Sequence, residues 1–159
     1  MKSIRSDSID FVLFSFNGID NVDINDRDLI LKEMKRVCRP GGHICFSTHN
    51  TLSVHNFYKI NYNSGLRKLL LNIIRVLKFP IHNFGIKNKL ANDFLYINDP
   101  GYNWSLKQFY INPFYQKKIL SSLGFKNIKL FNSVNGEETF DDHILSSPQN
   151  TWIYFLAEN

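Results

Sequence analysis

Two apolar runs near the start of the chain are each followed by a polar segment. Residues 9–16 are mostly apolar, with an Asp near their start and no alternation, a pattern typical of a parallel strand buried on both faces. Asn17-Gly18 ends this run. The second run, residues 43–46, leads into the polar Ser47-Thr48-His49-Asn50. The pattern predicts two strands with polar groups at their carboxyl ends.

The residues between these runs predict a helix. Apolar side chains recur at helical spacing from Ile30 to Val37, and basic residues occupy the other faces. Asn25 or Asp26 can cap its N-terminus, and Pro40-Gly41-Gly42 ends it. Strand, helix and strand together predict the right-handed crossover that joins parallel strands of one sheet.

The middle of the chain, residues 51–109, interrupts this pattern with a basic and largely helical segment. Leu and Ile residues form an apolar stripe over residues 64–79, which Asn63 or Ser64 can cap and Phe79-Pro80 ends. Two interpretations stay open for this helix. It covers the domain with a solvated basic face, or it serves as a lid, a docking surface or a membrane-surface helix.

The last third of the chain predicts one helix and two strands. Asn112 caps the helix, Pro113 opens it and Gly124 lies at its C-terminal end. Residues 126–131 alternate polar with apolar side chains, as a half-buried strand does, and residues 151–157 form a final apolar strand.

Composition narrows the class of protein. A chain of 159 residues with 43% hydrophobic residues suits a single folded domain. The net charge of +5 arises from residues 51–100, which hold seven basic and two acidic residues. No nucleic-acid motif, membrane-spanning run or signal-peptide core is evident, so we expect a cytoplasmic protein that binds no nucleic acid. Cys38 and Cys45 occupy positions that predict buried free thiols.

Two segments of the chain resemble the class I S-adenosylmethionine-dependent methyltransferases. Ser8-Ile9-Asp10-Phe11-Val12 and Arg36-Val37-Cys38-Arg39-Pro40-Gly41-Gly42 carry the match with its spacing, and a weaker match runs from Tyr110 to Phe125. The resemblance implies a Rossmann-like α/β fold, with a mostly parallel sheet and an antiparallel last strand. It also implies that residues 1–159 form one partial domain, truncated at its N-terminus to strands four to seven, with residues 51–109 inserted.

The resemblance and the strand-end rule together point to the residues of a site, because ligands of open α/β sheets bind beyond the carboxyl ends of strands. His49 is the candidate catalytic base, and Asp20 and Asn50 are candidate contacts to the methyl acceptor. The candidate contacts to S-adenosylmethionine are Ser15, Phe16, Asn17 and Gly18. The alternatives are a structural histidine and an Asn-Gly turn selected for its backbone geometry alone. The histidines lack the spacing of metal ligands, so we expect no metal.

Three functions remain after the sequence is read. The first is methyl transfer to a small molecule. We expect this activity to be weak or absent in the isolated chain, because the resemblance implies that two cofactor contacts belong to strands ahead of residues 9–16. These contacts are a Gly-rich turn that holds the cofactor and an acidic residue that binds its ribose hydroxyls. The second is a non-catalytic half-domain that pairs through residues 9–16 with a second copy or with a separate N-terminal half, since an exposed strand edge invites pairing. The third, a Rossmann-like dehydrogenase fragment, fits the Arg-Pro-Gly-Gly turn less well.

Overall fold

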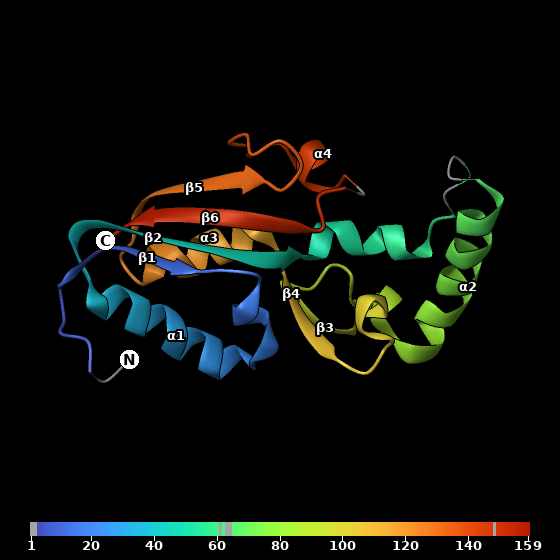
Figure 1. The fold of residues 1–159 in the computed structure, drawn as a ribbon, viewed down its shortest axis with the longest axis horizontal. Helices are drawn as coiled ribbons and strands as arrows, with labels where there is room; N and C mark the ends of the chain where they lie inside the picture. The colour runs from blue at the N-terminus through green and yellow to red at the C-terminus, as the bar shows by residue number, and fades with distance from the viewer. Residues whose placement is uncertain (1–2, 61, 63–64, 148) are drawn as a thin grey trace.

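The structure is a computed structural model that describes residues 3–60, 62, 65–147 and 149–159 (Figure 1). Its strands are β1 (Ile9–Phe14), β2 (Cys38–Asn50), β3 (Phe94–Asn98), β4 (Lys107–Ile111), β5 (Lys126–Asn132) and β6 (Trp152–Glu158). Its helices are α1 (Ile24–Val37), α2 (Leu66–His82), α3 (Pro113–Ser122) and α4 (Asp142–Leu145). Short 3-10 helices lie at η1 (Gly18–Asn21), η2 (Thr51–Tyr58), η3 (Ile86–Lys89) and η4 (Pro100–Tyr102).

β2 is the central strand of the sheet within the described residues. β6 pairs antiparallel with it along His43–His49, so β1 and β4 must share its other side. There β1 runs parallel to the first part of β2, and β4 runs parallel to its last residues. The carboxyl end of β1 and the strand β4 therefore lie on the same side of β2, one after the other along its length.

The predicted crossover is confirmed, and the prediction of a mostly parallel sheet is wrong. β1 and β2 are adjacent and parallel, joined through α1, and β6 is antiparallel as expected. However, β3 pairs antiparallel with β4, and β5 pairs antiparallel with β6. The parallel pairs are thus outnumbered. β3 lies within residues 51–109, which the sequence predicted to be largely helical.

One face of the sheet carries the main core, where α1 and α3 pack and which includes Leu31, Ile44 and Leu120. In the part of the chain that the structure describes, the other face is covered only over β3 and β4, by a second core that includes Phe79 of α2 and Tyr110. The prediction that the first strand is buried on both faces is wrong, since Phe11 and Leu13 of β1 are 51% and 59% exposed. Among the described residues, only β2 pairs with β1.

The boundaries of α1 differ slightly from the sequence prediction. Asp23 caps the helix by accepting hydrogen bonds from the backbone of Asn25 and Asp26, at 2.8 and 3.0 Å. The helix ends at Val37, and β2 already includes the Pro-Gly-Gly segment. A Cβ at Gly42 would lie 2.9 Å from the carbonyl oxygen of Asp10, because β1 and β2 approach closely there. The turn therefore needs a glycine at that position.

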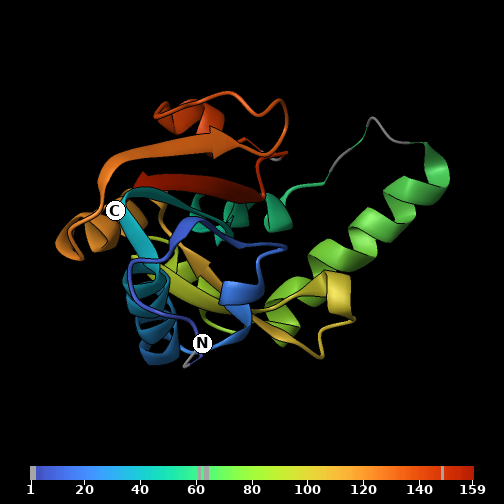
Figure 2. The same ribbon diagram turned by 60° about the vertical axis from the view of Figure 1, so that its left-hand side comes forward.

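α2 packs on the domain only near its C-terminal end, where Phe79 is buried in a core with Leu95 and Tyr110 of the sheet, so the interpretation as a covering helix is wrong for most of its length. Figure 2 shows it standing out from the rest of the molecule, and most of its apolar stripe is exposed. The helix continues through Pro80 to His82 rather than ending there. Its N-cap is Gly65, and the predicted caps Asn63 and Ser64 lie outside the described residues. Among the described residues, no helix has both the length and the apolar character needed to cross a membrane.

Candidate functional site

A cavity of about 1080 Å³ opens at the carboxyl ends of β1 and β2. Its wall also includes β4, β6 and the segment around η4. The lining residues that matter most below are Ser15, Phe16, Asn17, His49, Asp99 and Tyr110. Its volume matches the upper range of small-molecule sites, which is about 300–1,000 Å³.

The loop after β1 forms the rim of this cavity. Phe16 and Asn17 both adopt the left-handed backbone region, with φ of 55° and 52°. This conformation costs an ordinary residue such as Phe about 1–2 kcal/mol. The Asn17 N–H donates to Ser47 Oγ at 3.1 Å, which ties the loop to β2. The Phe16 side chain is 95% exposed, so this strained backbone presents an aromatic ring at the mouth of the cavity.

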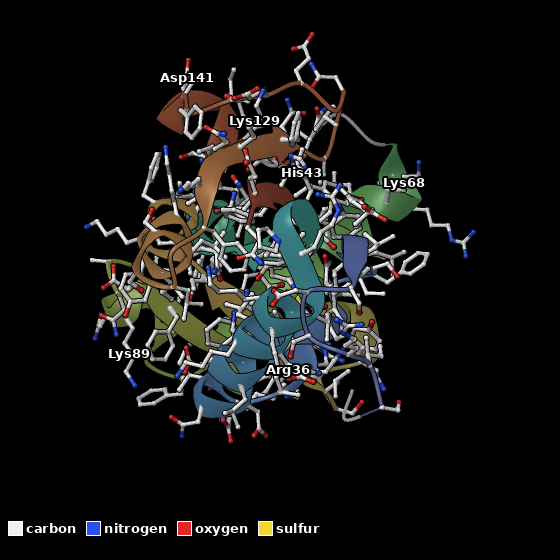
Figure 3. The ribbon with its side chains drawn as sticks, turned by 90° about the vertical axis from the view of Figure 1, so that its left-hand side faces the viewer. Arg36, His43, Lys68, Lys89, Lys129 and Asp141 are labelled. Carbon is white, nitrogen blue, oxygen red and sulfur yellow. The ribbon has the colours of Figure 1, made fainter. Side chains whose placement is uncertain are left out.

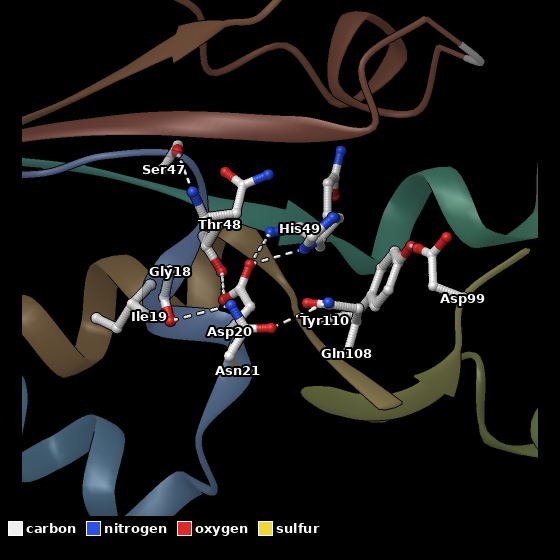
Figure 4. Close-up of polar contacts among 12 residues, drawn as sticks. Gly18, Ile19, Asp20, Asn21, Ser47, Thr48, His49, Asp99, Gln108 and Tyr110 are labelled. Atoms are coloured by element: carbon white, nitrogen blue, oxygen red, sulfur yellow. Dashed lines mark hydrogen bonds and ion pairs between the residues drawn. The ribbon is translucent and has the colours of Figure 1, made fainter. Parts of the chain in front are cut away.

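Asp20 is a buried carboxylate that joins the two strand ends (Figure 4). Its Oδ1 accepts hydrogen bonds from Arg27 Nη1 and Thr48 Oγ1, each at 2.6 Å. Its Oδ2 accepts from the backbone N–H of His49 at 2.7 Å and from His49 Nδ1 at 2.8 Å. These four donors match the four acceptor positions of an ionised carboxylate. Asp20 is therefore fully paired.

Arg27 supplies the counter-charge from the first turns of α1. Its guanidinium donates to Ile19 O at 3.1 Å and to Gln116 Oε1 at 2.8 Å, and it lies over the Phe109 ring at 4.8 Å. Burial lowers the pKa of Arg27, while the charge of Asp20 and its hydrogen bond act in the opposite direction. A buried ion pair thus lies directly behind the cavity wall.

His49 is oriented from three directions. Asp20 holds Nδ1, Tyr110 of β4 packs on the ring at 4.7 Å between centroids, and Trp152 of β6 approaches it edge-on at 6.3 Å. With Nδ1–H donated to Asp20, Nε2 is the nitrogen with a free lone pair. His49 lines the cavity, so this arrangement presents a proton acceptor to a molecule bound there.

A second polar group lies beside His49 on the cavity wall. Tyr110 OH donates to Asp99 Oδ2 at 2.8 Å, while Asp99 Oδ1 accepts from the backbone N–H of Gly101 at 2.6 Å. Burial, and then the charge of Asp99, raise the pKa of Tyr110 well above its ordinary value. Gln108 Nε2 donates to Asn21 at 3.0 Å, and Gln108 Oε1 is buried without a hydrogen-bond partner among the described residues. The wall therefore offers an unused acceptor.

The structure brings together four of the seven residues that the sequence singled out. Ser15, Phe16, Asn17 and His49 line the cavity. Gly18 lies against the Phe14 ring just outside it.

The two predicted substrate contacts lie behind the cavity wall. All four acceptor positions of the Asp20 carboxylate are occupied by hydrogen bonds within the protein. The Asn50 side chain forms hydrogen bonds with the backbone of Leu52, Leu145 and Asn150. Both side chains position other groups in this structure, so contact with a substrate is not the role that their geometry favours.

Sequence reasoning did not identify Arg27, Tyr110 and Asp99 as parts of a site. A signal existed for Arg27, because it is in phase with the apolar positions Leu31 and Met34 of α1, where a basic residue is unusual. No comparable signal marks Tyr110 and Asp99. Tyr110 reaches the cavity through the pairing of β4 with β2, and Asp99 follows β3, which pairs with β4. Within the described part of the chain, no group of three or more His, Cys, Asp or Glu residues could hold a metal ion.

The sheet with its helices has the fold of the class I S-adenosylmethionine-dependent methyltransferases. The chain resembles such a methyltransferase from Mesorhizobium loti with 11% identity and a TM-score of 0.55, over 98% of this chain and 64% of that one. It resembles one from Archaeoglobus fulgidus with 14% identity and a TM-score of 0.53, over 99% and 62%. A third, from Thermotoga maritima, has 12% identity and a TM-score of 0.52, over 98% and 58%.

These similarities concern the fold, and the chain spans 58–64% of the length of these three structures. No protein-family model matches the sequence. No curated protein matches it by sequence either.

Proposed function

We propose that the chain binds S-adenosylmethionine at the carboxyl ends of β1 and β2 and promotes methyl transfer to a small molecule in the same cavity. The observation that carries this proposal is the convergence of the loop Ser15–Asn17 with His49 on one cavity. The fold supports it, because the similar solved structures are described as S-adenosylmethionine-dependent methyltransferases.

The cavity fits part of such a ligand. S-adenosylmethionine supplies an electrophilic methyl group on a cationic sulfonium, and the exposed Phe16 ring is suited to a cation. Among the described lining residues the one carboxylate is Asp99, which is already engaged by Tyr110 and Gly101. The ribose hydroxyls therefore lack a free acidic partner there. A charge-assisted hydrogen bond contributes about 1.5–3 kcal/mol, so we expect weak binding by this chain alone.

His49 acts as the base in this proposal. Its Nε2 accepts the proton that the acceptor oxygen or nitrogen loses, while Nδ1–H stays on Asp20. The carboxylate of Asp20 stabilises the imidazolium that forms, and Arg27 forms an ion pair with that carboxylate at 2.6 Å. Asp20 and Arg27 are thus positioning residues, and His49 is the catalytic residue.

Calorimetric titration tests the cofactor site. We expect saturable binding of S-adenosylmethionine, and Phe16→Ala should weaken it about fivefold because a cation–aromatic contact contributes about 1 kcal/mol. The same substitution should have less effect on binding of S-adenosylhomocysteine, whose sulfur is a neutral thioether. Val134→Ala is the matched control, because Val134 is 57% exposed and does not line the cavity. Equal loss for both ligands, or no loss, would contradict the role of Phe16.

The second candidate function is that of a half-domain that pairs with another chain through β1. Three observations favour it: Phe11 and Leu13 are exposed, the outer edge of β1 has no partner in the described residues, and neither of these two side chains joins a core cluster there. Sedimentation equilibrium of the wild type, of Leu13→Lys and of the α1 control Leu29→Lys tests self-pairing. Association that only Leu13→Lys abolishes would support it, whereas monomers throughout would exclude a second copy as the partner.

A further inference from the structure

We propose that α2 docks on an anionic lipid surface. Its exposed apolar stripe enters the headgroup region, and the basic side chains beside the stripe contact lipid phosphates. This inference goes beyond the proposed function and does not depend on it.

The α2 stripe consists of Leu66, Leu70, Ile74, Leu77 and Ile81. These residues lie four, four, three and four positions apart, which places them on one face of a helix. Each is between 42% and 84% exposed. Phe84, just past the end of α2, is 96% exposed and extends the apolar surface. A row of large apolar side chains in water is unfavourable and marks an interaction surface.

The opposite face of α2 holds the helix to the domain. Phe79 is buried, stacks on Phe57 with ring centroids 4.8 Å apart and contacts the edge of Tyr58 at 5.0 Å. At about 100° per residue, Phe79 lies half a turn from Leu70 around the helix axis. The anchor therefore directs the α2 stripe away from the domain, as the projecting helix in Figure 2 illustrates.

The charge around the stripe favours an anionic surface as the partner. Residues 59–89 hold seven Lys and Arg residues and no Asp or Glu. Arg67 and Lys78 follow stripe residues directly in the helix. Lys68, labelled on α2 in Figure 3, lies nearly opposite the stripe at about 100° per residue, so it does not flank the stripe. An apolar face with flanking basic residues is the pattern of a helix that lies in the plane of an anionic membrane. The core of a protein interface, by contrast, is depleted of lysine.

Vesicle flotation with the whole chain tests this inference. We expect the wild type to float with vesicles of phosphatidylcholine and phosphatidylglycerol and to float poorly with phosphatidylcholine alone. Leu70→Glu with Leu77→Glu should reduce partitioning at least about tenfold, since both apolar side chains leave the lipid. Leu29→Glu on α1 is the matched control, because Leu29 is 61% exposed, close to the 60% and 64% of Leu70 and Leu77.

A second pair of variants tests the charge separately. Arg67→Gln and Lys78→Gln should each weaken partitioning about fivefold, and added salt should weaken the wild type in the same direction. Circular dichroism confirms that each variant is folded. Three results would overturn the inference: no flotation with anionic vesicles, equal flotation with both lipid mixtures, or a stripe variant that floats like the wild type. A stripe variant that dissociates a dimer without altering flotation would instead assign the stripe to a protein contact.

Discussion

Replacing Asp20 by Asn is the sharpest test of the buried network behind the cavity. The substitution preserves the shape of the side chain but removes its charge and turns one acceptor into a donor. Whichever way the amide is oriented, it loses two of the four hydrogen bonds that Asp20 accepts from Arg27, Thr48 and His49. It also leaves the Arg27 guanidinium buried without a counter-charge.

The expected loss of stability is about 3–5 kcal/mol, the usual effect of removing one partner of a buried ion pair. Two lost hydrogen bonds to a charged group alone account for about 3 kcal/mol. For a chain of this size the corresponding decrease in Tm is about 6–20 °C. Urea unfolding followed by circular dichroism measures the difference directly.

A double-mutant cycle with Arg27→Met then separates the ion pair from the rest of the network. We expect the double variant to be more stable than the sum of the two single losses implies, because no unpaired guanidinium remains. Asp10→Asn is the control, since Asp10 pairs with Arg39 in an exposed ion pair and its loss should be undetectable. A loss below about 1 kcal/mol for Asp20→Asn, or additive effects in the cycle, would refute the reasoning.

Three further predictions concern other parts of the fold. Folding raises the pKa of Tyr110 through burial and then Asp99, so its contribution to stability is complete below about pH 10 and is lost as the pH rises towards the folded-state pKa. Urea midpoints should therefore fall with pH less steeply in Tyr110→Phe than in the wild type, and parallel profiles would contradict this. Gly42→Ala should cost about 1–3 kcal/mol in thermal unfolding, because its Cβ would lie 2.9 Å from two carbonyl oxygens; an unchanged Tm would count against that packing. Burial raises the pKa of the Cys38 and Cys45 thiols, so disulfide-exchange reagents should react slowly with the folded chain and faster in denaturant, and equal rates would disprove the burial.

The crossover of the fold could be predicted from sequence because its signals are local. An apolar run identifies each strand, and Pro-Gly-Gly marks the close approach of β1 and β2 at Gly42. The presence of β3 could not be predicted, since the short apolar run within Phe94–Asn98 fits a strand or a helix equally well. The periodicity of α2 revealed an apolar face but contained no information on what covers it. Exposure depends on neighbours distant in the chain.

The candidate site also has one part whose position could be predicted from the sequence and another part that could not. His49 was found because a polar residue at the end of a strand faces the ligand side of an open sheet. Asp20 was assigned to the substrate, although its partners Arg27 and His49 enclose it from two different elements. Asp20 and Arg27 are only seven positions apart in the sequence, but their contact requires η1 to fold back over the start of α1. Sequence spacing alone does not specify that geometry.

The register of the sheet explains why the imidazole can be held so firmly in an otherwise open cavity. His49 is paired in register with Tyr110 of β4 on one side and with Trp152 of β6 on the other, so backbone pairing sets both ring contacts. Asp20 then fixes the remaining rotation of the ring through Nδ1. The proposed base is thus placed by strands, whereas Phe57, Arg75 and the segment Asp99–Tyr102 of the cavity lining come from outside the strands, within residues 51–109. In the proposed reaction, changes in those residues would alter the choice of acceptor while leaving the position of the base unchanged.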